Sequence, residues 1–137
     1  MNRIANARRT FKTRTIALAA SVMLVSLIPS LVSASAPAAL VDTQAPTAPA
    51  NLKFTSGNST SISMKWDASS DNVGVVAYEI YRTNYGVLAG VVSGSTLNFT
   101  DVGLTPGTPY SYSVKAVDAA GNRSAWSNPI GITLPNS

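Results

Sequence analysis

The chain has 137 residues, ten of them basic and six acidic, and it contains neither cysteine nor histidine. Disulfides, thiolate nucleophiles, imidazole bases and the Ser-His-Asp triad are therefore excluded, together with metal sites that use Cys or His. Five basic residues lie within the first fourteen positions and the rest of the chain carries a net charge of −1, so the basic balance does not indicate a nucleic-acid partner.

The first part of the chain has the order of a secretory signal peptide. Residues 1–14 are basic, residues 15–28 are almost wholly apolar or small, and Pro29 and a run of small residues follow. We expect residues 1–34 to form a signal-peptide helix that is cleaved after Ala34, with Ala38 as the alternative cleavage point. An uncleaved membrane anchor is the other interpretation, but the unbroken apolar run is shorter than a membrane span. The sequence thus predicts a secreted, extracellular protein with no membrane contact after cleavage.

The next segment, residues 35–45, is rich in Ala, Pro, Thr and Ser and is predicted to be an extended linker. The folded domain is expected over residues 46–134, with residues 135–137 as a C-terminal tail. Because there are no disulfides, a domain of this size must be stabilised by its hydrophobic core alone.

Apolar and polar residues alternate in short runs from residue 51 onward, which is the pattern of half-buried strands. Turn signals rich in Gly, Asn, Ser and Pro separate the runs, and no sustained helical periodicity follows residue 35. An all-β fold is predicted, a seven-stranded two-sheet sandwich around one buried Trp. The alternating apolar residues are Leu52 and Phe54; Ile62, Met64 and Trp66; Tyr78 and Ile80; Leu97 and Phe99; Tyr110, Tyr112, Val114 and Ala116; and Ile130, Ile132 and Leu134.

Three motifs resemble those of a fibronectin type III domain over residues 46–134. Trp66 ends the second run, the motif YEIYR begins at Tyr78, and the motif LTPGTPY runs from Leu104 to Tyr110. The last motif is similar to the turn that carries a tyrosine corner. The resemblance implies an immunoglobulin-like sandwich in which Trp66, Tyr78, Leu104 and Tyr110 have structural roles. The Tyr110 hydroxyl is expected to bond to backbone a few residues upstream.

The segments DNVGV (71–75) and AVDAAGNRS (116–124) resemble the variant of this domain found in secreted bacterial carbohydrate-active enzymes, such as chitinases and cellulases. In those enzymes such modules lie between catalytic and carbohydrate-binding domains. The resemblance implies a secreted, monomeric, non-catalytic module that acts as a spacer or accessory domain in extracellular polysaccharide degradation. Its partners would be the other domains of a larger secreted enzyme, and a linker to a next domain would begin near residues 136–137.

Two alternative functions stay open on the sequence. One is a free-standing weak binding module for glycans or the cell wall. The other is a fragment of a glycoside hydrolase whose catalytic domain is absent.

The acidic residues do not predict a catalytic site. Glycoside hydrolysis requires two carboxyl groups that face each other across a cleft. The side chains of Asp67, Asp71, Asp101 and Asp118 lie at strand ends and turns, where a short carboxylate bonds to local backbone N–H groups. We therefore expect these residues to form turns, and the chain to be neither an enzyme nor a cofactor-binding protein.

Calcium is the one metal ion for which the sequence offers candidate ligands. In a sandwich of this kind Asp42, Asp71 and Asp118 would lie at one pole, with Asn72 and Asn122 as further oxygen donors. Calcium takes six to eight oxygen ligands, and the chain has no EF-hand spacing. We favour three independent turn caps, so no metal site is predicted.

Exposed aromatic residues are the candidates for surface binding. Tyr81, Tyr85 and Trp126 fall on outward or loop positions, where rings of this kind stack on sugars in carbohydrate-binding proteins. They lie on different strands, however, and do not indicate one flat strip. The segment from Arg123 to Ser127 resembles the Trp-Ser-x-Trp-Ser box of cytokine-receptor modules. We therefore favour a packing role for Trp126, with Lys115 of the neighbouring strand stacked on its ring.

Overall fold

The computed structural model describes residues 40–137. The predicted signal peptide and residues 35–39 of the predicted linker lie outside the described residues. No helix within residues 40–137 has the length and apolar character needed to cross a membrane. The seven strands are β1 (Ala50–Asn58), β2 (Ser61–Asp67), β3 (Val75–Arg82), β4 (Val87–Ser93), β5 (Asn98–Val102), β6 (Pro109–Asp118) and β7 (Ile130–Thr133).

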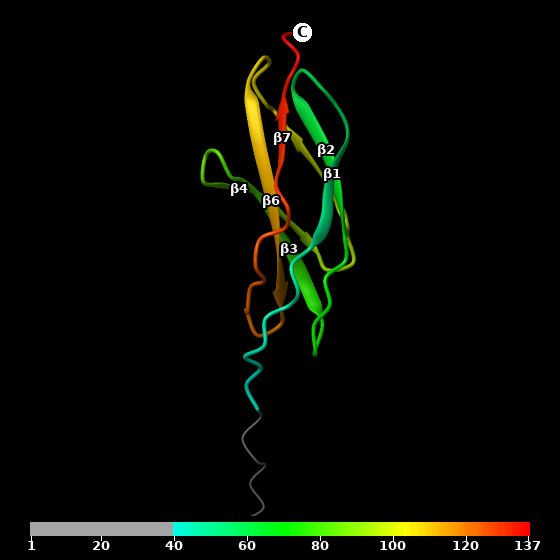
Figure 1. Ribbon diagram of the computed structural model, residues 1–137, viewed down its shortest axis with the longest axis vertical. Coiled ribbons are helices and arrows are strands. Elements are labelled where there is room, and N and C mark those ends of the chain that lie inside the picture. Colours follow the sequence, from blue (N-terminus) through cyan, green and yellow to red (C-terminus); the bar gives the residue numbers. More distant parts are fainter. Residues whose placement is uncertain (1–39) are drawn as a thin grey trace, which may run out of the picture. The chain divides into compact units, whose positions relative to one another are not determined.

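The strands form two antiparallel sheets that pack face to face (Figure 1). One sheet has the order β1-β2-β5, and the other has the order β4-β3-β6-β7. The predicted seven-stranded two-sheet sandwich is therefore confirmed. Strands β2, β3 and β6 occupy the inner positions of their sheets, which explains why their apolar residues alternate most regularly.

The core lies between the two sheets and is built from the alternating residues of the inner strands. Ile62, Met64 and Trp66 of β2 face Tyr78 and Ile80 of β3, and all five are at most 3% exposed. The Trp66 ring meets the Tyr78 ring edge to face, with centroids 5.4 Å apart. Edge-to-face aromatic pairs of this kind stabilise a core beyond the area that they bury.

Two elements depart from the alternating pattern. Phe54 follows the core residue Leu52 on β1 but is 45% exposed, because β1 is an edge strand whose register with β2 shifts on both sides of Lys53–Phe54. Strand β4 is not among the alternating runs identified from the sequence, because its sequence VLAGVVS does not alternate. Gly90 on β4 lies so close to Phe99 of the opposite sheet that a Cβ atom there would approach the ring within 2.6 Å.

The two ends of the compact unit 41–137 lie at opposite poles of the sandwich (Figure 1). Residues 41–49 approach the pole that also carries the loop after β2 and the loop after β6. The C-terminal residue lies beyond the end of β7 at the other pole.

Candidate functional site

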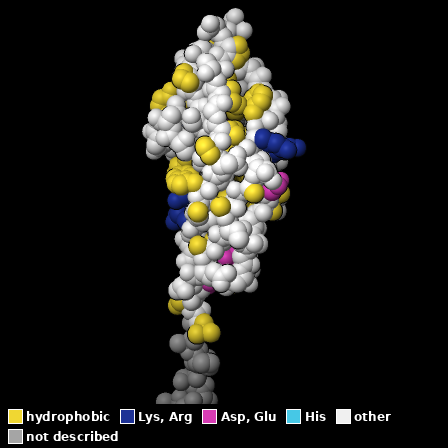
Figure 2. All heavy atoms as spheres, viewed as in Figure 1, with side chains coloured by type: hydrophobic (Ala, Val, Ile, Leu, Met, Phe, Trp, Pro, Cys, Tyr) yellow, Lys and Arg dark blue, Asp and Glu magenta, His cyan; other side chains and the backbone are white. Residues whose placement is uncertain are grey.

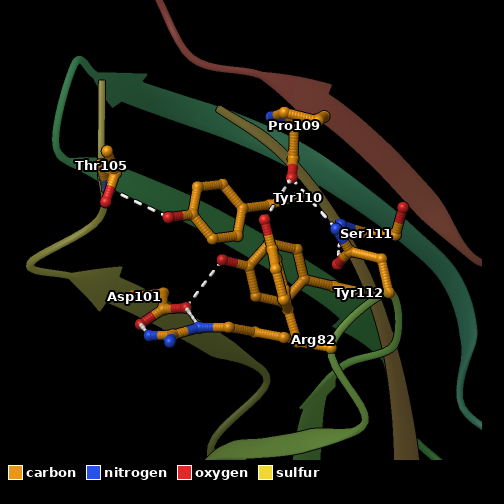
Figure 3. Close-up of polar contacts among 9 residues, drawn as sticks. Arg82, Asp101, Thr105, Pro109, Tyr110, Ser111 and Tyr112 are labelled. Carbon is orange, nitrogen blue, oxygen red and sulfur yellow. Dashed lines mark hydrogen bonds and ion pairs between the residues drawn. The ribbon is translucent and has the colours of Figure 1, made fainter. Parts of the chain in front are cut away.

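A polar cluster of Arg82, Asp101 and Tyr112 joins the two sheets (Figure 3). Arg82 at the end of β3 binds Asp101 of β5 with both Nε and Nη2, each 2.7 Å from a carboxylate oxygen. The Tyr112 hydroxyl of β6 donates to the same carboxylate at 2.7 Å. Asp101 is 4% exposed. The prediction that Asp101 forms a turn is therefore wrong, because its side chain points inward and pairs across the sandwich.

The electrostatics of this cluster keep Tyr112 protonated and Arg82 charged. Burial, reinforced by the hydrogen bond to Asp101, raises the pKa of Tyr112, so its hydroxyl keeps the proton that it donates. The hydrogen bond to Asp101 raises the pKa of Arg82 further above its usual value. The cluster is a brace between the sheets, because each of its charged groups is already paired.

The tyrosine corner lies beside this brace (Figure 3). The Tyr110 hydroxyl accepts a hydrogen bond from the backbone N–H of Thr105 at 3.0 Å, as predicted. Tyr85 packs against the Tyr110 ring with centroids 5.5 Å apart. Tyr85 is half exposed, and its ring lines a pocket with Tyr110, whereas Tyr81 and Trp126 line a different pocket.

Tyr81 and Trp126 meet on the outer face of the second sheet. Their rings lie edge to face, with centroids 5.0 Å apart and planes 84° apart. Lys115 Nζ lies 4.2 Å from the centroid of the Trp126 ring, so the predicted cation–π contact is present. A pocket of about 380 Å³ borders this pair and is lined by Tyr81, Thr83, Gly86 and Trp126.

Serine hydroxyls hold the Trp126 segment against β6. Ser124 and Ser127 each accept a hydrogen bond from a β6 backbone N–H through the side chain, at 2.8 and 2.9 Å. Their own backbone N–H groups donate to carbonyls of the same strand. Before β7 begins, these serine bonds thus take the place of strand pairing along β6. They also fix the position of Trp126.

A second ion pair borders the aromatic pair. Arg123 binds Glu79 through Nη2 at 2.8 Å and Nε at 3.0 Å, and the Tyr81 hydroxyl donates to Glu79 at 2.8 Å. The bond from Arg123 lowers the pKa of Glu79 against the opposing effect of burial. Burial and the bond to Glu79 raise the pKa of Tyr81. The Tyr81 hydroxyl is therefore engaged within the protein.

The structure brings the three calcium candidates together. Asp42 precedes β1, Asp71 lies in the loop after β2, and Asp118 ends β6, yet one carboxylate oxygen of each lies within 4.8 Å of the others. Each of the three also accepts a hydrogen bond from backbone of its own turn, as the turn-cap interpretation requires. Asp67 instead accepts a hydrogen bond from the Asn51 side chain.

Asp118 is the most buried of the three, at 2% exposure. It accepts hydrogen bonds from the backbone N–H and side-chain amide of Asn122, at 2.8 and 2.7 Å. Burial opposes ionisation of Asp118, but the bonds from Asn122 and the adjoining backbone outweigh it and lower the pKa. The carboxylate is therefore charged at neutral pH.

Apolar side chains do not gather into one patch on the face drawn in Figure 2. They appear as separate small areas among polar atoms, and the charged side chains are also scattered. This face therefore does not by itself indicate a docking surface.

Comparison with known proteins places this arrangement among related modules. The sequence profile of the fibronectin type III domain matches residues 47–133. Chitinase Chi52 of Paenibacillus xylanexedens is 50% identical over 95 residues, which are 69% of this chain and 17% of that protein. Exoglucanase B of Cellulomonas fimi is 42% identical over 92 residues, which are 67% of this chain and 8% of that protein. The chain thus spans less than a fifth of the length of these relatives.

Solved structures give the same picture of the fold. Chitinase ChiA74 from Bacillus thuringiensis matches 74% of this chain with 15% of its own length, at 35% identity and a TM-score of 0.64. The crystal structure of FN3tt matches 69% of this chain with 100% of its own length, at 22% identity and a TM-score of 0.56. The second match bears on the fold alone.

Proposed function

The chain belongs to the fibronectin type III domain family, and from that premise we propose that it is a secreted, non-catalytic accessory module of extracellular polysaccharide degradation. In this role it holds neighbouring domains apart. The observation that carries the proposal is the context of its relatives: a segment 42–50% identical to this chain forms 8–17% of two chitinases and an exoglucanase. The basic and apolar leader in residues 1–34 supports export.

The geometry suits a spacer. The two ends of the unit 41–137 lie at opposite poles, so domains joined there would be separated by the length of the sandwich (Figure 1). The Arg82–Asp101 pair joins the two sheets, and the tyrosine corner fixes the connection between β5 and β6. These contacts resist shear between the sheets, which a spacer must withstand.

A weak glycan-binding role is the second candidate, and the pocket beside Tyr81 and Trp126 favours it. Two features weigh against it. The ring planes are 84° apart, whereas a sugar-stacking strip needs rings that share a plane, and Lys115 occupies one face of the Trp126 ring. Our proposal therefore does not depend on this pocket.

The test inserts the module between a chitinase catalytic domain and a chitin-binding domain. Two reference fusions carry either no insert or a flexible Gly/Ser linker of matched reach. We expect the module to raise the rate on insoluble chitin and to leave the rate on soluble oligosaccharides unchanged. The same insert carrying Trp126→Ala should perform equally well.

Other outcomes identify the alternatives. If the purified protein sediments with insoluble chitin or cellulose and Trp126→Ala abolishes this retention, the module is a glycan binder. If the purified protein hydrolyses chitin, cellulose or starch, the non-catalytic proposal is wrong. The intact mass of the secreted product, captured with an antibody to residues 46–134, tells whether further domains accompany the module.

A further inference from the structure

Three carboxylates from separate segments converge at the pole where residues 41–49 approach the sandwich. One oxygen each of Asp42, Asp71 and Asp118 lies within 4.8 Å of the others. We propose that these three residues form a calcium-binding site. The proposal is independent of the accessory role and of the aromatic pocket, which lies on the outer face of the second sheet.

In both Asp42 and Asp71, hydrogen bonds to the turn account for only one of the two carboxylate oxygens. Asp42 Oδ1 accepts hydrogen bonds from the Gln44 N–H at 3.0 Å and from the Asn72 amide at 3.2 Å. Asp71 Oδ2 accepts from two backbone N–H groups, including that of Gly74 at 2.9 Å. The second oxygen of each, Asp42 Oδ2 and Asp71 Oδ1, is shielded from solvent and has no hydrogen-bond partner. A buried carboxylate oxygen without a partner is costly, and a bound cation would satisfy both of these oxygens at once.

The charge of the cluster is also uncompensated by the protein. The two ion pairs among residues 40–137 are Arg82–Asp101 and Arg123–Glu79, and neither includes a member of the cluster. The donors that reach the cluster are neutral amides, chiefly that of Asn122. Charges taken out of water are normally paired or bound to a metal ion. A divalent cation would balance most of the charge of three carboxylates.

The dimensions and donor set favour Ca²⁺ over Mg²⁺. Ca–O distances of about 2.3–2.6 Å place opposite ligands roughly 5 Å apart, which accommodates oxygens separated by up to 4.8 Å. Mg–O distances of about 2.0–2.1 Å require a tighter octahedron. All the donors are oxygens, and the backbone carbonyls of Asp42 and Gln44, now bound by the Asn122 amide, lie at the same place. Such a set approaches the six to eight oxygens that Ca²⁺ takes.

The bound ion would tie three regions that are distant in sequence. Asp42 belongs to the segment before β1, Asp71 to the loop after β2 in one sheet, and Asp118 to the end of β6 in the other. Calcium would therefore fix the direction in which residues 41–49 reach the domain. It would also raise the thermal stability of the sandwich, because a ligand that binds only the folded state stabilises it.

The test uses the full-length protein, freed of metal with EDTA and dialysed. Isothermal titration with CaCl2 should show one ion bound per chain, with a Kd on the order of 10⁻⁴ M, typical of extracellular calcium modules. Thermal unfolding in 10 mM CaCl2, about a hundred times that Kd, should occur about 10–20 °C higher than in EDTA. The same concentration of MgCl2 should produce at most a small part of this increase.

Two isosteric variants separate metal binding from turn formation. Asp42→Asn and Asp71→Asn each keep an amide oxygen for the turn hydrogen bonds but lose the charge, and each should weaken calcium binding at least tenfold. The matched control is Asp67→Asn, which changes an exposed Asp outside the cluster and should leave the affinity within twofold.

Three results would overturn the proposal. One is the absence of both saturable binding and a melting shift in the unmodified protein. Another is an equal shift with MgCl2, which would indicate screening of like charges. The third is unchanged calcium affinity in Asp42→Asn. Residue 42 lies before the first strand, so this substitution leaves the core intact.

Discussion

Replacing Asp101 by alanine removes the acceptor of three hydrogen bonds that join the two sheets. Two of these bonds come from Arg82 and one from Tyr112, each 2.7 Å long. The Arg82 side chain is 28% exposed and the Asp101 side chain 5%. After the substitution the guanidinium loses its counter-ion and the fully buried Tyr112 hydroxyl loses its acceptor.

The expected loss of stability is about 3–5 kcal/mol. Removal of one partner from a buried ion pair costs about 3–5 kcal/mol, and partial solvent access of Arg82 places its share at the lower end. An unsatisfied buried hydroxyl costs about 1–3 kcal/mol. Because a domain of this kind is stable by roughly 5–15 kcal/mol in total, the variant should retain a folded state with a much lower urea midpoint.

Urea unfolding, followed by the fluorescence of buried Trp66, measures the change. The matched control is Asp67→Ala, another Asp in a strand but exposed, which should change stability by less than about 0.5 kcal/mol. In a double-mutant cycle with Arg82→Met, the two losses should be less than additive, by about 1–3 kcal/mol. A loss below about 1 kcal/mol for Asp101→Ala, or strict additivity in the cycle, would refute the assignment of a brace between the sheets.

Three further predictions concern the core, the corner and the acid range. Trp66→Ala should cost about 3–5 kcal/mol, and cooperative melting near the parent temperature would show that Trp66 is not central to the core. Tyr110→Phe should cost about 1 kcal/mol, at the low end for a lost hydrogen bond, because the Thr105 N–H lies at an exposed turn and can turn to water. The lowered pKa of Glu79 means that its ion pair contributes stability above the unfolded pKa of about 4.3, which is lost as pH falls through the folded value. Glu79→Gln should therefore flatten the stability profile below about pH 4.5, and an unchanged profile would contradict this.

Alternation along the inner strands was sufficient to predict the core. The positions Ile62, Met64 and Trp66 are buried because their strand is paired on both sides, so each inward side chain has neighbours from the opposite sheet. The tyrosine corner was equally accessible, since Thr105 and Tyr110 are close in sequence. Both features can be predicted from the sequence because each depends on residues that are only a few positions apart in the chain.

Asp101 shows how a usable signal was missed. It follows Phe99 by two residues on β5, so the period of a strand places its side chain on the inward face. A charge that faces inward needs a partner, and the chain has few candidates. Which cation pairs with it depends on the register of the two sheets, and the sequence does not contain that register in any local pattern.

The sequence by itself determined the fold class, the buried residues of the inner strands and the expectation of export, because each depends on the order of neighbouring residues. Only the tertiary structure decided that Arg82 meets Asp101, and that one oxygen from each of three aspartates on separate segments lies within 4.8 Å of the others. These contacts join segments on different strands or sheets. Their geometry follows from how the sheets pack, and two oxygens left without partners become visible only when that packing is known.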